Sequence, residues 1–350
     1  MLSSRTETIL RSIVRQYITK ATPVPSQSIT SDYKLGVSAA TVRNEMVHLE
    51  QEGYITRPHP SAGSIPSDKG YRCYVDSLGD IKLPLAEQRL VGHLFHQVEE
   101  ELNKWLNLAA TLIAQMVQNA AVVTMPKPEA SQFKHLELIS LQESMVLAII
   151  VLNGANVREE FITFDPMISP PELTVIANKL SAAYSDLTVS QILAKSKGFT
   201  SNEKQITDYL VKVMKAEDEQ EYKEQYLDGL HFILNQPEFA YSKRVLTLMK
   251  LVEQRNLLRS IVPQRLMSGR VQVFIGRENE TEAIRDYSVV ISRYGLPQKA
   301  IGTIGVIGPT RMPYGRTIAT VDYLSSVMSR LAAKLYGRDV SSEPNPDGTD

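Results

Sequence analysis

Residues 36–72 constrain the fold of this chain more than any other run, because they join a short capped helix to a glycine turn and a segment rich in Pro, Ser and Gly. Ser38 suits the N-cap position, since its hydroxyl can accept a hydrogen bond from a free backbone N–H of the first turn. Val42, Met46 and Leu49 recur at i, i+4 and i+7, which places them on one buried stripe. We therefore expect a short amphipathic helix followed at once by a hairpin.

The neighbouring segments extend this pattern on both sides. Apolar residues at helical spacing predict two helices before this one, the second over residues 26–33. After it, Gly53 ends the helix, residues 54–57 begin the hairpin, and Ser67 can cap a last helix. This order is that of a winged helix-turn-helix, which places one helix in the DNA major groove and a loop beside it. We predict a winged-helix DNA-binding domain over residues 1–80.

The candidate DNA contacts lie on the polar face of the central helix and in the loop after it. Thr41 and Asn44 can reach base edges past small neighbours, and Arg43 on the flank suits a phosphate. The alternative is an ordinary solvated face, because residues 1–80 hold nine Lys or Arg against eight Asp or Glu, a weak basic footprint. The predicted DNA-binding residues are Ser38, Ala40, Thr41, Arg43, Asn44, His48, Arg57, His59, Ser61, Gly63 and Ser64.

Four runs resemble the HrcA family of heat-inducible transcription repressors. They are Val37-Ser-Ala-Ala-Thr-Val-Arg-Asn-Glu-Met, Ser61-Ala-Gly-Ser-Ile-Pro-Ser-Asp-Lys-Gly-Tyr-Arg, Tyr74-Val-Asp-Ser-Leu and Ile307-Gly-Pro-Thr-Arg-Met-Pro-Tyr-Gly-Arg. They occur in the family's order and at about its positions, so the resemblance spans most of the chain, least clearly over residues 185–230. Family members usually carry Arg where this chain has Ser64, which removes a phosphate or minor-groove contact from the wing.

The resemblance implies a homodimeric repressor of chaperone genes in the bacterial cytosol. Its operator would be the inverted repeat called CIRCE, and a GroEL-type chaperonin would keep it active until heat diverts the chaperonin to unfolded clients. Two recognition helices in successive major grooves also require an inverted repeat. In one alternative hypothesis, the chain still binds DNA, but its operator affinity is controlled by a small effector bound in a pocket that residues 299–316 close. A scaffold protein with no operator preference is the third hypothesis.

The rest of the chain predicts an α+β protein of several domains. Strand patterns occur over residues 135–164 and again over 271–307, and a helical pattern separates them. A further helix is expected over residues 318–336. The HrcA resemblance implies that residues 84–170 and 264–339 form one GAF-like α/β domain. Residues 171–263 would then be an inserted, mostly helical dimerising subdomain, with an acidic run at 217–221 on a solvated face. The polar residues 340–350 predict a disordered tail.

Apolar residues between Val91 and Met116 follow a heptad and predict one long helix. This helix either packs on its own chain or forms a seam with a second one. His93, His96 and Glu100 fall on its solvent side, so we expect no metal site there. One cysteine, Cys73, excludes an internal disulfide, and we expect a packed, inert thiol.

No pattern in the chain predicts an enzyme or a cofactor. Gly302, Gly305 and Gly308 have neither the Walker nor the dinucleotide spacing, so we expect a closely packed strand. Arg311 and Arg316 after them either bind an anion or dock the domain against its neighbour. No run approaches the roughly 18 apolar residues of a membrane span, and we expect no membrane contact.

Overall fold

The computed structural model describes residues 2–335 except 33–37, 60–61, 99–100, 128–129, 143, 154–155, 166, 196–197, 220–224, 240–242, 254–256, 263–265, 267–269 and 297–299. The fold is α+β, as predicted, and it divides into two compact units. Unit 1 comprises Met1–Met125, Glu224–Gly295 and Gly302–Asp350. Unit 2 comprises Pro126–Lys223 and Leu296–Ile301.

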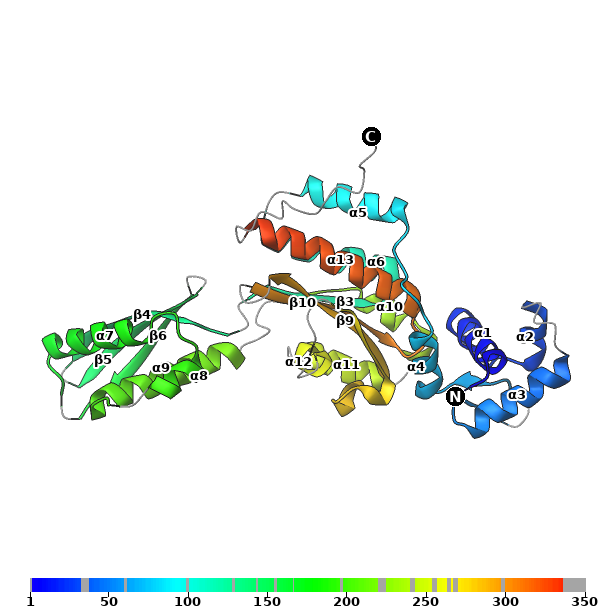
Figure 1. Cartoon of the computed structure of the whole chain (residues 1–350), viewed down its shortest axis with the longest axis horizontal. Helices are drawn as coiled ribbons and strands as arrows, with labels where there is room; N and C mark the ends of the chain where they lie inside the picture. The colour runs from blue at the N-terminus through cyan, green and yellow to red at the C-terminus, as the bar shows by residue number, and fades with distance from the viewer. Residues whose placement is uncertain are drawn as a thin grey trace. The chain divides into compact units, whose positions relative to one another are not determined.

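Unit 1 begins with the helices and hairpin that the sequence predicts (Figure 1). Ser67 caps the last helix of this region by accepting a hydrogen bond from the N–H of Gly70, at 3.1 Å. The two short strands pair antiparallel. The elements are, in order, α1 (Ser4–Lys20), α2 (Ser26–Asp32), α3 (Ala39–Gln51), β1 (Ile55–Thr56), β2 (Ile65–Pro66) and α4 (Asp68–Asp76).

A five-stranded sheet forms the rest of unit 1. Its order is β7 (Gln225–Asp228), β3 (Ala120–Thr124), β10 (Ala300–Pro309), β9 (Tyr287–Leu296) and β8 (Gln272–Ile275). The last three confirm predicted strands. The sequence analysis missed β3 and β7, which pair with each other antiparallel. All five residues of β3 are buried, so it has no alternation of apolar and polar residues to reveal a strand.

Helices lie on both sides of this sheet. Figure 1 shows α6 (Leu102–Val117) and α13 (Tyr314–Leu335) on one side, with α5 (Leu85–Gln97) outside them. α11 (Lys243–Glu253) and α12 (Leu257–Ile261) lie on the other side, and α10 (Leu230–Leu234) follows β7. The predicted helix over residues 318–336 is confirmed and begins earlier, at Tyr314.

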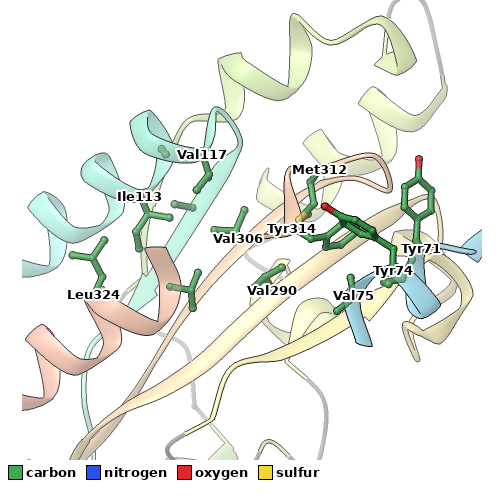
Figure 2. Close-up of a cluster of buried hydrophobic side chains, with 14 of the residues drawn as sticks. Tyr71, Tyr74, Val75, Ile113, Val117, Val290, Val306, Met312, Tyr314 and Leu324 are labelled. Carbon is green, nitrogen blue, oxygen red and sulfur yellow. The ribbon is translucent and has the colours of Figure 1, made fainter. Parts of the chain in front are cut away.

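One buried hydrophobic cluster runs from the N-terminal helices into the sheet. Tyr71 of α4 and Tyr314 of α13 are both buried, and their ring centroids lie 5.8 Å apart (Figure 2). The same cluster contains Ile13 of α1 and Val290 of β9. Residues 1–80 therefore share a core with the sheet, although the sequence analysis expected them to form a separate small domain.

The prediction of one long heptad helix is wrong. The backbone is extended at Val98 (φ −87°, ψ 134°) and at Glu101 (φ −120°, ψ 122°), so two helices, α5 and α6, replace it. The break lets both apolar faces contribute to the same core, since Phe95 and Trp105 are 6% and 3% exposed. The heptad therefore packs on its own chain, which was one of the two alternatives.

Unit 2 is built around its own three-stranded antiparallel sheet, β4 (Phe133–Gln142), β5 (Met145–Leu152) and β6 (Asn156–Thr163). Its helices are α7 (Pro170–Tyr184), α8 (Val189–Lys195) and α9 (Ser201–Glu219). The three strands are confirmed, but the predicted domain boundaries are wrong. Strands over 133–163 pair only with one another among the described residues, so they belong to the inserted unit instead of the larger sheet.

The acidic run at the end of α9 is not simply solvated. Glu217 pairs with Arg158, whose Nε lies 2.8 Å from the carboxylate, and Asp218 accepts a hydrogen bond from the N–H of Ser131 at 2.7 Å. These bonds fix α9 against β6 and the start of the sheet. The predicted disordered tail, residues 340–350, lies outside the described residues.

Candidate nucleic-acid interface

Helix α3, the predicted recognition helix, begins where the sequence predicts. Ser38 has an extended backbone (φ −72°, ψ 157°), and its Oγ accepts a hydrogen bond from the N–H of Thr41 at 3.2 Å. The two hydroxyl oxygens lie 3.0 Å apart. Both hydroxyls thus belong to the helix cap, so a base contact by Thr41 would compete with this hydrogen bond.

The solvent-facing side of α3 carries most of the predicted contacts. Ala40, Arg43, Asn44 and His48 are exposed, whereas Thr41 is half-buried. Val47, which the sequence analysis did not select, is 39% exposed on the same side. Val47 could have been predicted from the sequence, because it follows Asn44 by three residues and so lies on the same side of the helix. An apolar side chain there can contact a thymine methyl group. The opposite side is buried and consists of Val42, Met46 and Leu49.

Glu45 anchors α3 to α1. Its carboxylate accepts hydrogen bonds from the Thr6 hydroxyl at 2.7 Å and from Arg5, whose Nη2 lies 2.9 Å away. The Thr6 hydrogen bond, helped by Arg5, lowers the pKa of Glu45 below its ordinary value. These bonds fix the angle at which α3 presents its exposed face.

The predicted wing residues differ in accessibility. His59 is exposed, and Arg57 is partly exposed and pairs with Glu50 at 3.2 Å. A Cβ on Gly63 would lie 2.5 Å from the backbone carbon of Val24, so only glycine fits this approach. Ser61 lies outside the described residues.

Ser64, a predicted DNA contact, is covered in this structure. Its exposed fraction is 0%, because its N–H and C=O pair with Val24 at 2.9 and 2.8 Å. Its Oγ is buried and has no hydrogen-bond partner among the described residues. The sequence placed Ser64 in an open loop, whereas the bridge to Val24 covers it.

Arg43 and Arg57 line one cavity of about 380 Å³ between α2, α3 and the wing. Ser64 and Gln27 also line it. The fold thus brings two predicted DNA-binding side chains, 14 positions apart in the chain, to the same opening. Two guanidinium groups there suit a phosphate, since arginine provides several fixed N–H donors.

Charged contacts join this region to the sheet. The guanidinium of Arg72 in α4 donates to Glu278 (Nε to Oε1, 2.8 Å) and to the carbonyl oxygen of Val273 in β8 at 2.6 Å. Asp68 at the start of α4 accepts from the N–H of Arg277 at 3.0 Å. The hydrogen bond to Glu278 raises the pKa of Arg72 above its ordinary value. α4 therefore holds the predicted DNA-binding region against the edge strand β8.

Arg311 and Arg316 serve as docking residues, one of the two alternatives that the sequence left open. Arg311 pairs with Glu238 and donates to the carbonyl oxygen of Ile18 in α1 at 3.1 Å. Arg316 donates to the carbonyl oxygen of Met116 at 2.7 Å and pairs with Glu87 at 3.0 Å. Both guanidinium groups are occupied, so they offer no anion site.

The predicted small-effector pocket under residues 299–316 is not supported either. Residues 300–309 form β10, a strand inside the sheet. A Cβ on Gly302 would lie 2.4 Å from the Tyr294 ring, which confirms close backbone packing instead of a phosphate loop.

The remaining features agree with a structural role. Burial, with a smaller effect of Glu7, raises the pKa of the Cys73 thiol, which fits the packed, inert thiol that we expected. Within the described parts of the chain, no helix is both long and apolar enough to cross a membrane.

Comparisons with known proteins define the family. The family model for the HrcA protein C terminal domain matches residues 103–318. The heat-inducible transcription repressor HrcA of Dehalococcoides mccartyi (strain BAV1) is 54% identical over 338 residues, covering 97% of this chain and 98% of that protein. HrcA of Chloroflexus aggregans is 39% identical and covers 98% and 96% of the two chains.

A solved structure has the same fold. It is the crystal structure of a hypothetical protein at 2.2 Å resolution, whose sequence is 22% identical to this one. The two structures superpose with a TM-score of 0.56, over 95% of this chain and 98% of the other. The chain thus belongs to the HrcA family of heat-inducible transcription repressors, and it is a transcription regulator rather than an enzyme.

Proposed function

We propose that this repressor binds a CIRCE-type inverted repeat through α3 and the wing of residues 1–80, acting as a winged-helix domain. The observation that carries this proposal is the exposed polar face of α3, with Asn44 at its centre and Arg43 beside it. Asn44 suits a bidentate contact to adenine, whereas Arg43 and Arg57 together hold a backbone phosphate at their shared cavity. The rest of unit 1 is the GAF-like domain.

The exposed face of the unit 2 sheet supports a homodimer formed through the insert. Residues of odd number on the central strand β5 point away from the helices, and Leu147 lies between Ile139 of β4 and Phe161 of β6. Ile139 and Phe161 are 40% and 62% exposed. An apolar patch of this kind marks a protein interface. A second copy can cover it symmetrically, as in most dimers.

The heat switch follows from the family resemblance. A GroEL-type chaperonin keeps the repressor competent to bind its operator in the cytosol, and heat withdraws the chaperonin. The repressor then leaves the nucleoid, and transcription of the chaperone genes rises. The competing switch, a small effector, changes operator affinity without chaperonin.

Operator binding of the full chain tests this proposal. Fluorescence anisotropy is measured with a CIRCE-type duplex, a duplex with one half-site scrambled and a fully scrambled duplex, each with and without active chaperonin. We expect loss of one half-site to weaken binding sharply and chaperonin to raise the active fraction. Operator binding that is the same with and without chaperonin would contradict the proposed heat switch but would still support recognition of the operator. Equal binding to all three duplexes would contradict the repressor model itself.

A further inference from the structure

Val47 of α3 is an apolar side chain for which the fold of its own chain provides no packing role. It is 39% exposed, and it belongs neither to the hydrophobic core nor to the partly buried side chains that pack against the core. Among the described residues before Leu85, it is the only large apolar side chain that is exposed. A single exposed valine is common on protein surfaces and needs no partner by itself. Its neighbours on the helix therefore decide whether it has a role.

Val47 lies within the helix face that we assign to the operator. A helix turns about 100° per residue, so Val47 lies about 40° from Arg43 and about 60° from Asn44 around the axis. It is between these two side chains and one turn further along the helix. Ala40 and Gln51 are exposed on the same side. Val47 therefore continues the row of side chains that would face the base pairs.

A valine in a helix presents its two methyl groups rigidly. The branch at its Cβ leaves one strongly preferred χ1 rotamer, so little side-chain entropy is lost when the methyl groups contact a partner. The same branch gives valine a lower helix propensity than alanine, lysine or glutamine, which all suit a solvated helix face better. Exposure of the apolar surface to water is also unfavourable until another apolar group covers it. Helix stability and hydration thus do not account for a valine here, whereas contact with an apolar group does.

We propose that Val47 contacts the 5-methyl group of a thymine in the operator and so contributes to its specificity. This methyl group is the apolar group that base edges present in the major groove. The rise from Asn44 to Val47 is about 4.5 Å along the helix, against about 3.4 Å between base pairs, so the thymine lies within about two base pairs of the adenine assigned to Asn44. The inference rests on the proposed operator binding through α3 and adds to it the base that Val47 distinguishes.

Replacement of thymine by deoxyuridine tests this contact, because it removes the methyl group and keeps every hydrogen-bonding group of the base pair. Each thymine of a CIRCE-type duplex is replaced in turn, at the same position of both half-sites. The affinity of the full chain is measured by fluorescence anisotropy at one fixed salt concentration. We expect one position at which the replacement weakens wild-type binding about 16-fold, since each of the two methyl groups contributes about fourfold, or about 0.8 kcal/mol.

Two valine variants show whether Val47 makes the contact. Val47→Ala should bind the unmodified duplex about 16-fold more weakly than the wild type, and deoxyuridine at the sensitive position should weaken it no further. Val175→Ala is the matched control, because Val175 is 65% exposed on α7 of unit 2. It should respond to deoxyuridine as the wild type does. Both changes shorten exposed side chains and favour the helix, so both variants should fold, which circular dichroism checks.

The inference is overturned if no thymine replacement weakens wild-type binding by more than about twofold. It is also overturned if Val47→Ala keeps the full sensitivity to deoxyuridine, because another side chain then contacts the methyl group. Failure of the proposed function gives a different result, since the wild type would then bind the inverted-repeat and scrambled duplexes alike, which overturns both. If the wild type prefers the repeat and Asn44→Ala reduces that preference, but deoxyuridine has no effect, only the role of Val47 is wrong.

Discussion

The exposed face of α3 in unit 1 and the exposed face of the sheet in unit 2 have opposite chemistry. Ala40, Arg43, Asn44 and His48 make the α3 face largely polar and basic. The sheet face in unit 2 carries Ile139, Leu147 and Phe161 in one cross-strand row. Both elements bury their other side in a core, so burial does not account for the difference.

The difference shows which kind of partner each face suits. A polar helix face with adjacent arginines keeps its hydration until a charged, hydrogen-bonding partner replaces the water, as DNA does. An apolar sheet face gains free energy when any apolar surface covers it. Changes at the unit 2 face should therefore alter assembly, whereas changes at the α3 face should alter sequence discrimination.

The largest expected effect is on assembly. Phe161→Asp puts a charge at the more exposed end of the apolar row, and we expect the dimer to dissociate at least about 30-fold more readily, a cost of about 2 kcal/mol or more. Sedimentation equilibrium measures this constant. Leu193→Asp is the matched control, because Leu193 is 49% exposed on α8 in the same unit.

Both variants should remain folded, since both side chains are exposed. If Leu193→Asp dissociates the protein and Phe161→Asp does not, the sheet face is not the dimer interface, and the comparison between the two faces fails.

The next largest effect is expected on the stability of the contacts that join α4, and with it the N-terminal region that contains α3, to the sheet. Arg72→Ala removes the hydrogen bonds to Glu278 and to the carbonyl oxygen of Val273. Hydrogen bonds to charged groups contribute about 1.5–3 kcal/mol each, so we expect the free energy of unfolding to fall by about that amount. Thermal and urea unfolding measure it, with Arg89→Ala as the control. Equal stability of the two variants would show that α4 is not held by these bonds.

The N-terminal region was predictable because its signals are local. The cap at Ser38, the stripe of Val42, Met46 and Leu49, and the cap at Ser67 each depend on residues within one helical turn or two. Long-range pairing was not predictable. Ser64 is covered only because it pairs with Val24, 40 positions earlier, and no local pattern indicates that bridge.

The inserted unit was mispredicted for a related reason. The strands over residues 133–163 were identified correctly, but a strand pattern does not specify which sheet it joins. The sequence analysis missed β3 and β7. These two strands pair next to β10 and complete the larger sheet, so the strands over residues 133–163 are not part of it. At the candidate site, most of the predicted residues on α3 are exposed, whereas Ser64 is covered. The sequence could not distinguish the two cases, because the exposure of a side chain depends on the tertiary fold.

A smaller effect is expected in the pH dependence of the free energy of unfolding, through Glu45 of α3. The folded state lowers the pKa of Glu45 below its ordinary value of 4.5, so its contribution to stability is complete above that pH. This contribution is lost as the pH falls through the folded-state pKa. We therefore expect the stability difference between wild type and Glu45→Gln to be constant at neutral pH and to shrink in acid, in urea unfolding at several pH values. A difference that grows in acid would contradict the Thr6 and Arg5 contacts.

The smallest effect is expected at Ser64. Ser64→Ala removes a buried hydroxyl that has no partner among the described residues, so stability should stay equal or rise by less than about 1 kcal/mol. Operator affinity should also stay equal, because the side chain is covered. A marked loss of operator affinity in an anisotropy titration would show that Ser64 reaches DNA after all.

Sequence discrimination by Asn44→Ala tests the central claim most directly. The ratio of affinities for the inverted-repeat and scrambled duplexes is compared in wild type, Asn44→Ala, Arg43→Ala and the exposed-site control Asn107→Ala. Loss of one bidentate base contact should reduce discrimination by about 1–3 kcal/mol in Asn44→Ala. Arg43→Ala should weaken both duplexes alike and flatten the salt dependence. Unchanged discrimination in Asn44→Ala would contradict the assignment of the α3 face as the surface that reads the operator.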